Sequence, residues 1–197
     1  SRQAQENDTR RVRGWNRQPL PSDQDGQATW HNLLADLRHL LESFRPEVIL
    51  TPHPRLDPHP DHVAATQAIR EATRQSQWQP ATFLLYANHL HDNDRWPMGP
   101  AGGGIGLAPA FDTQEAESFW SLPLSPAAQL DKAMALAMQH DLAPRLPFKK
   151  RLRRWLQSVL AGRRWPRTGE NEYFRKAVRS HELFHVRPAT AFCQSAS

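Results

Sequence analysis

The alternation of helical and extended patterns between residues 29 and 86 constrains the fold of this chain more than any other feature. Apolar residues recur at i, i+3, i+4, i+7, i+11 and i+14 from Trp30 to Phe44, which predicts an amphipathic helix. Thr29 is its expected N-cap, and Pro46 is expected to end it. Three more elements follow: a buried strand over 48–50, a helix over 63–74 and a strand over 82–86. Helix, strand, helix and strand with short links predict a parallel α/β sheet.

The second half of the chain predicts further elements around a long loop. Five of the nine glycines lie between Gly99 and Gly106, in a stretch without the GK[ST] of a phosphate-binding loop, so a surface loop is expected there. The elements expected after it are a strand over 119–122, a helix opened by Ser125-Pro126 and ending near 139, a basic helix over 148–161 and a strand over 182–186.

The numbers of cysteines and histidines limit which side chains could bind a metal ion. The single cysteine, Cys193, excludes an internal disulfide and a CxxC zinc site, so any metal must be held by histidine and carboxylate. Ten histidines make such a site feasible. Apolar runs are too short for a transmembrane helix. No apolar segment lies near residue 1, so the sequence given contains no intact signal peptide. We expect a cytoplasmic protein, with peripheral association at a membrane as an alternative, and any targeting signal would lie upstream of Ser1.

The chemistry is concentrated over residues 53–62, directly after the first predicted strand, where three histidines and two aspartates occur. Ligands of open α/β sheets bind at the carboxyl ends of the strands, so a binding edge is expected here. His59 and His62 can face one cavity, and Asp61 between them could hydrogen-bond an imidazole and set its tautomer. Imidazole and carboxylate without thiolate suit zinc or another divalent transition metal, although histidines also cap helices.

The order helix, RPEVILTP, short loop and D-x-HPDH resembles the LmbE-like/PIG-L family of metal-dependent N-deacetylases. The resemblance covers residues 29–142, because SLPLSPAAQLDKAMALAMQHDL is similar to that family's return strand and Lys-containing helix, and is weaker over 170–186. It implies a Rossmann-like three-layer α/β/α fold with a mainly parallel sheet. The family's upstream AHPDD-type motif is absent, so we expect an incomplete domain. Residues 1–28 would be a polar lead-in from a truncated N-terminal half, and 29–197 the C-terminal part of one deacetylase-like domain.

The same resemblance implies an amide hydrolase that acts on a linear C–N bond. Its substrate would be an N-acetylglucosamine-type sugar or conjugate, and its cofactor Zn²⁺ or another divalent metal. His62 would be the third metal ligand, a cationic His59 would stabilise the oxyanion, and Asp61 would tune the neighbouring histidine. The other ligands and the general base belong to the absent motif, so we expect this chain alone to be inactive. Glu6 with Arg2 or Arg10 aligns poorly with the family's Arg/Glu-bearing helix.

Two other functions compete with this interpretation. Residues 57–62 match the HxHxDH motif of metallo-β-lactamase-like hydrolases at every position but the first, yet that fold requires many strands before the motif. The second is a noncatalytic module that uses the basic helix over 148–161. Phe148 and Trp155 belong to its apolar stripe, and Lys and Arg fill the gaps, which suits an anionic membrane surface. The alternative for this helix is packing against its own domain.

Nucleic acid is not an expected partner, because no aromatic platform accompanies the positive charge. The net charge of +5 conceals a segment, 142–169, that contains Lys and Arg but no acid. A polar cluster just past the second strand is expected to be solvated, and its members are His89, His91, Asp92 and Asp94. The oligomeric state is not predicted.

Overall fold

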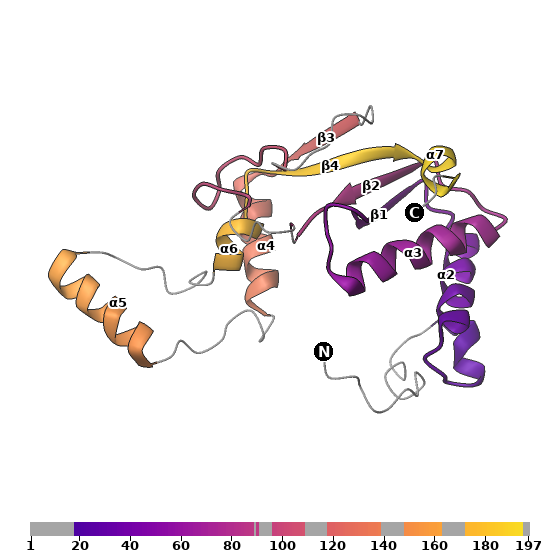
Figure 1. Cartoon of the computed structure of the whole chain (residues 1–197), viewed down its shortest axis with the longest axis horizontal. Coiled ribbons are helices and arrows are strands. Elements are labelled where there is room, and N and C mark those ends of the chain that lie inside the picture. The colour runs from indigo at the N-terminus through magenta and orange to yellow at the C-terminus, as the bar shows by residue number, and fades with distance from the viewer. Residues whose placement is uncertain are drawn as a thin grey trace. The chain divides into compact units, whose positions relative to one another are not determined.

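The computed structural model describes residues 18–88, 90, 96–108, 118–138, 148–162 and 172–194 (Figure 1). In chain order the elements are η1 (Pro21–Gln24), α2 (Trp30–Phe44), β1 (Val48–Pro52), α3 (Pro60–Gln75), β2 (Thr82–Tyr86), β3 (Ser118–Pro123), α4 (Pro126–Ala137), α5 (Phe148–Ala161), α6 (Glu172–Ala177), β4 (His181–Pro188) and α7 (Ala189–Gln194). Every helix and strand expected from the sequence is present, whereas η1, α6 and α7 were not expected. No helix in the described ranges is long and apolar enough to cross a membrane.

Helix α2 begins and ends where its sequence predicts. The Thr29 side chain accepts a hydrogen bond from the backbone N–H of Asn32 at 3.2 Å, which satisfies one of the otherwise unpaired amides of the first turn. At the other end Arg45 adopts the left-handed conformation with φ of 50°, and its N–H donates to the Leu41 carbonyl at 2.9 Å. Pro46 follows and cannot continue the helix.

The end of the expected lead-in is attached to α2 by a buried polar pair. The backbone N–H of Ser22 donates to Asp36 Oδ1 at 2.9 Å, and its hydroxyl donates to Asp36 Oδ2 at 2.8 Å. Both side chains are buried, so the carboxylate replaces lost water contacts with two protein donors. This pair fixes η1 on α2.

The four strands form one sheet in the order β1-β2-β4-β3. β1 and β2 pair in parallel, from Val48 with Thr82 to Pro52 with Tyr86, and α3 is the crossover between them. β4 pairs antiparallel with β2. The expected α/β class and Rossmann-like arrangement are confirmed, and the antiparallel β4 makes the sheet mixed.

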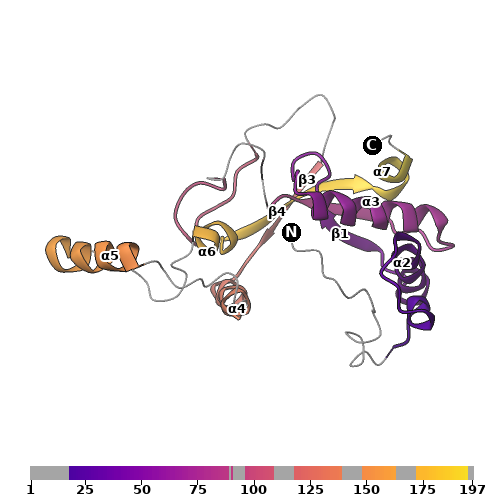
Figure 2. The ribbon, with the colours of Figure 1, turned by 60° about the horizontal axis from the view of Figure 1, so that its bottom comes forward.

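Two hydrophobic clusters, which share Ile49 and Ile69, hold α2, α3 and α7 against β1 and β2. In the first, the rings of Phe83 on β2 and Phe192 on α7 lie 4.8 Å apart. The second joins α2 to α3, where alanines on α3 allow the two helices to approach closely; its buried members are Leu34, Leu41, Ala68 and Ala72. α3 therefore runs alongside β1 with α2 packed against it (Figures 1 and 2).

β1 is an edge strand with one covered face. Ile49 packs into both clusters, whereas its neighbours Val48 and Leu50 are 47% and 56% exposed. Side chains alternate between the two faces of a strand, so the described residues cover the face of Ile49 and leave the other face open at Val48 and Leu50, although not at buried Pro52. Within the described ranges no strand pairs with its outer edge.

The chain divides into two compact units, which we describe separately. The first comprises 1–94, 110–120 and 184–197, and the second comprises 95–109 and 121–183. The second contains α4, α5 and α6. As predicted, α4 starts with Pro126 at its first position and with Ser125 as its cap, which accepts the Ala128 N–H at 3.1 Å. The expected division at residue 28 stays a prediction.

The glycine-rich loop of the second unit is fixed by arginine side chains. Arg175 donates to the carbonyls of Pro97 and Gly99 at 3.0 and 2.9 Å, and the buried Arg179 donates to two further carbonyls of the loop. Burial, followed by the nearby charge of Arg175, lowers the pKa of Arg179. These contacts give the described part of the loop a structural role.

Candidate metal-binding and catalytic site

The site segment is anchored to the ends of β1 and β2. The His53 N–H donates to the Tyr86 carbonyl at 2.6 Å, which extends the strand ladder by one residue. The Thr66 hydroxyl of α3 donates to the Pro52 carbonyl at 2.7 Å and lies 2.9 Å from the Thr51 hydroxyl. These buried bonds fix the first two turns of α3 at the carboxyl end of β1, as the sheet rule requires.

α3 begins at Pro60, three residues before the predicted start at Val63. Pro suits the first helical position, because its missing N–H would be unpaired there. His59 is the N-cap, and its Nδ1 accepts the backbone N–H of Asp61 at 3.3 Å. The apolar pattern begins one turn later than the helix, so the cap and not the pattern marks the true start.

Asp57 is the buried centre of the site. Its side chain is 0% exposed, and its Oδ2 accepts the backbone N–H of Asn88 at 2.8 Å, just beyond β2. The same oxygen lies 2.9 Å from His62 Nδ1. One carboxylate thus connects the loop after β1, the chain after β2 and an imidazole on α3. A buried charge without such partners would be strongly unfavourable.

The His62 ring presents Nδ1 to this carboxylate at ion-pair distance. A carboxylate beside Nδ1 favours a proton on that nitrogen and leaves the lone pair on Nε2 available. The side chain is 27% exposed, so it is open to solvent on one side. Metal-binding histidines commonly have this arrangement, in which the second ring nitrogen faces a carboxylate.

His59 lies beside His62, with ring centroids 4.9 Å apart. Its cap bond requires an Nδ1 without a proton, which places the proton on Nε2. Asp61, whose side chain is 85% exposed, lies 4.0 Å from the same Nδ1, and an exposed pair at that distance contributes little. The cap bond therefore leaves Nε2 as the ring nitrogen that faces away from the helix backbone, and the role predicted for His59 stays a prediction.

The structure brings Asp57, rather than Asp61, to the predicted metal ligand His62. The sequence favours Asp61 for the tuning role, because it lies between the two histidines. The signal that could have found Asp57 is its position at the end of the loop, where a carboxylate can accept amides from two strands. The role predicted for Asp61 stays a prediction.

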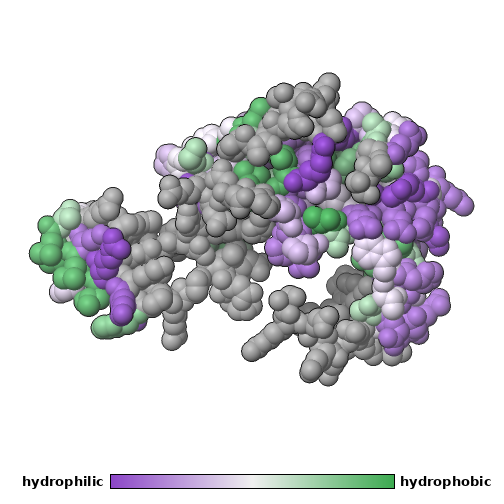
Figure 3. Space-filling view, in the orientation of Figure 1, coloured by the Kyte–Doolittle hydropathy of each residue, from purple (hydrophilic) through white to green (hydrophobic). Residues whose placement is uncertain are grey.

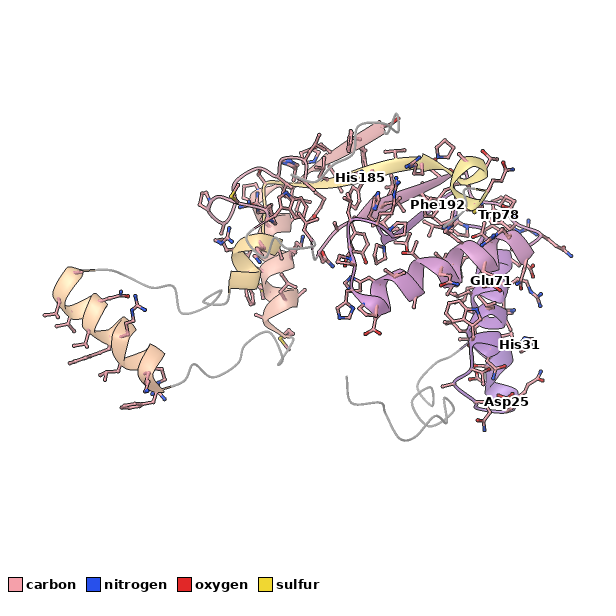
Figure 4. All side chains as sticks on the ribbon, in the orientation of Figure 1. Asp25, His31, Glu71, Trp78, His185 and Phe192 are labelled. Atoms are coloured by element: carbon pink, nitrogen blue, oxygen red, sulfur yellow. The ribbon has the colours of Figure 1, made fainter. Side chains whose placement is uncertain are left out.

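A second histidine pair was missed from the sequence. His53 is buried, and its Nδ1 accepts the N–H groups of Arg55 and Leu56 at 3.2 and 3.1 Å. Its ring meets that of buried His185 edge-on, with ring centroids 4.8 Å apart. His185 lies on β4 (Figure 4), and the Phe119 ring contacts the His185 ring at 4.9 Å. His53 thus closes the turn after β1, and only the register of β4 could have placed His185 there.

The described residues supply one candidate ligand of a zinc site, His62. His62 lies beside a buried carboxylate, but the described part of the chain contains no group of three His, Cys, Asp or Glu side chains that could hold a metal. Zinc sites use three or four protein ligands, so His62 alone does not complete one. Other residues considered from the sequence lie outside the described ranges: Arg2, Glu6, Arg10, His89, His91, Asp92 and Asp94.

Two open hollows of about 340 and 300 Å³ lie along α2, and no residue of 53–62 lines either one. Trp30 lies between them, and its Nε1–H donates to Glu71 on α3 at 3.2 Å. Neither lining contains His59 or His62. The candidate site is therefore identified by the histidines and aspartates at the strand ends, and not by the presence of a pocket.

Comparison with known protein families gives a match over the first part of the chain. The family model described as GlcNAc-PI de-N-acetylase (PIG-L) matches residues 4–73, a segment that contains α2, β1 and most of α3. It begins upstream of residue 29, where the expected resemblance started, and ends well before residue 142. No curated protein and no solved structure gives a significant match. Over residues 4–73, which carry the D-x-HPDH motif, the predicted resemblance to the PIG-L family of GlcNAc-PI de-N-acetylases is confirmed.

Proposed function

We propose that this chain carries half of the active site of a metal-dependent N-deacetylase. The reaction is hydrolysis of the amide of an N-acetylglucosamine-type sugar or conjugate, which releases acetate and a free amine. The observation that carries the proposal is the Asp57–His62 contact of 2.9 Å beside His59, within the segment that matches a de-N-acetylase family.

His62 is the residue that would hold the metal, through Nε2. Zn²⁺ or another divalent transition metal is proposed, because imidazole and carboxylate are the donor types present. When bound, such a cation polarises the acyl carbonyl and activates water. The contribution of this chain is to position the ligand. Asp57 lies against Nδ1 of the imidazole, on the opposite side of the ring from Nε2, and the buried hydrogen bond of Thr66 fixes the helix that carries His62.

His59 is proposed as the donor to the oxyanion of the tetrahedral intermediate. Its Nδ1 is occupied by the cap of α3, so its orientation is set before substrate arrives. A donor that needs no reorientation during the reaction stabilises developing charge efficiently, and one such donor is worth about 3–4 kcal/mol. The 4.9 Å between the two imidazole rings lets one acyl group meet both residues.

The experiment uses the full-length gene product and three single variants: His62→Ala, His59→Ala and His31→Ala. His31 is an exposed histidine of α2 and serves as the matched control (Figure 4). Bound zinc after dialysis and acetate release from an N-acetylglucosamine conjugate are measured for each. His62→Ala should lose the metal, and His59→Ala should keep it while kcat falls by roughly 10²–10³.

His31→Ala should change neither quantity. Loss of metal in both His59→Ala and His62→Ala would make His59 a ligand, as the metallo-β-lactamase-like interpretation requires. Unaltered acetate release in both variants would contradict the proposal.

A further inference from the structure

Helix α5 exposes its entire apolar stripe. Six large apolar side chains occur at i, i+4, i+7, i+8, i+11 and i+12, which places them on one face of the helix. Each is 40–80% exposed, and together they are Phe148, Leu152, Trp155, Leu156, Val159 and Leu160. Figure 3 shows green, hydrophobic surface on α5 next to purple, hydrophilic surface of the same helix. Among the described residues, no helix or strand packs extensively against α5.

The rest of α5 is strongly cationic. The helix contains five basic residues and no Asp or Glu; the basic residues are Lys149, Lys150, Arg151, Arg153 and Arg154. The sequence before and after the helix is also basic, with Arg145 on one side and Arg163 and Arg164 on the other. No Asp or Glu occurs between 142 and 169. A partner for this helix must therefore offer an apolar interior and negative charge side by side.

We infer that α5 binds the surface of an anionic lipid bilayer and lies in the plane of its headgroups. The apolar stripe with Trp155 would enter the headgroup boundary, while Lys and Arg would meet the lipid phosphates. A nucleic acid would satisfy the charges but leave the apolar stripe in water. A bilayer satisfies both, and this complementarity of charge and apolarity is the reason for choosing it. The inference is independent of the deacetylase chemistry.

The α4 helix provides an internal contrast. Leu130, Met134 and Met138 also form an exposed stripe, at 61–83% exposure, but the only charged residues of α4 are Asp131 and Lys132. If exposure of apolar side chains were sufficient, α4 would bind lipid as well as α5 does. If positive charge is also required, only α5 binds.

The test is co-sedimentation of the full chain with vesicles of phosphatidylcholine alone or with about 30% phosphatidylglycerol. Binding is expected only with the anionic lipid. It should weaken strongly between low salt and about 1 M salt, where the Debye length falls to about 3 Å. One Lys or Arg near such a surface contributes about 1 kcal/mol, which is roughly fivefold in binding. The double variant Lys149→Gln/Arg151→Gln should therefore bind about 25-fold more weakly.

Two matched controls accompany these measurements. Arg38→Gln/Arg74→Gln removes the same charge from exposed positions on α2 and α3, and should change binding by less than about twofold. Trp155→Ala/Leu160→Ala should reduce binding at least about tenfold, whereas Leu130→Ala/Met134→Ala on α4 should not. Far-ultraviolet circular dichroism checks that each variant is folded.

Equal losses in the two charge variants would overturn the inference, because net charge and not α5 would then be responsible. Binding that ignores salt and lipid charge would overturn it too. So would a concentration-dependent oligomer that Trp155→Ala/Leu160→Ala abolishes in a chain that binds no vesicles, because a second copy would then cover the stripe. None of these measurements uses acetate release. A negative result for vesicle binding would therefore not bear on the proposed deacetylase activity.

Discussion

The α2–α3 pair and α5 carry the same kind of sequence pattern and end in opposite environments. In both regions apolar residues recur at helical spacing, and in both the helix is present as predicted. Leu41 of α2 is 4% exposed against α3, whereas Leu160 of α5 is 80% exposed. The difference teaches that periodicity specifies a helix and its apolar face, while a neighbouring strand or helix decides whether that face is covered.

The largest expected effect contrasts a leucine from each region. Leu41→Ala should lower the free energy of unfolding by about 2–5 kcal/mol, because it removes buried methyl groups and leaves a cavity between α2 and α3. Leu160→Ala should change it by less than about 0.5 kcal/mol, since its side chain is exposed. Urea unfolding of the two variants gives both numbers. Similar losses would mean that α5 is packed in solution, and the contrast would fail.

The second prediction compares the buried Asp57 with the exposed Asp61 in their effect on zinc affinity. Asp57→Asn should lower zinc affinity about 10- to 100-fold in the full-length gene product, because it weakens the carboxylate that orients His62. Asp61→Asn should leave the affinity within about twofold, since that side chain is largely exposed. Competition with a chelator measures both. A larger effect at Asp61 would restore the role that the sequence suggested for it.

The helix caps of α2 and α4 provide a smaller contrast between a packed helix and an exposed one. Thr29→Ala removes the cap of packed α2 and should cost about 1 kcal/mol of unfolding free energy. Ser125→Ala removes an equivalent cap from α4, in which no residue is buried, so global unfolding should shift less. Hydrogen exchange at the first turn of α4 should nevertheless accelerate. Equal global shifts would show that α4 unfolds together with α2.

The smallest effect concerns Cys193, in the cluster that packs α7 against β2. Burial raises the pKa of its thiol, and Arg70 and Arg74 oppose this rise. The folded state therefore retains the proton at a pH where the unfolded chain, with a pKa of about 8.5, releases it. Its stabilising effect is present below that value and is lost as pH rises toward the folded pKa.

For Cys193 the loss at pH 9 should stay below about 0.9 kcal/mol, given 1.36 kcal/mol for each pKa unit. Urea unfolding of the parent chain and of Cys193→Ala at pH 7 and pH 9 isolates this component. The parent should lose more stability than the variant over this interval. A larger loss in the variant would have the wrong sign for a buried neutral thiol.

Most of the secondary structure could be predicted, because its signals are local. Thr29 and Pro46 bracket α2, and Ser125-Pro126 opens α4, as cap and proline chemistry requires. The start of α3 was placed too late because the prediction followed the apolar pattern to Val63 and passed over the cap at His59. Helix α7 was missed because its six residues are too short to show a period.

The candidate site was predicted in composition but not in arrangement. His59 and His62 were identified from their spacing, and the structure places their rings side by side. The burial of Asp57 and the contact of His53 with His185 depend on how β1, β2 and β4 align. Such long-range pairing leaves no signal in a single sequence, so residue type alone favoured the exposed Asp61.

Among the described residues no strand pairs with the outer edge of β1, and such an edge affects how a protein behaves at high concentration. Edge strands of soluble proteins are commonly protected by lysine, by bulges or by proline, which keep them from pairing with other chains. In Val48–Pro52 there is no charge, and proline occurs only at the last position. Exposed Val48 and Leu50 add apolar surface along this edge. A chain in which this edge stays unpaired is expected to associate more strongly as protein concentration rises.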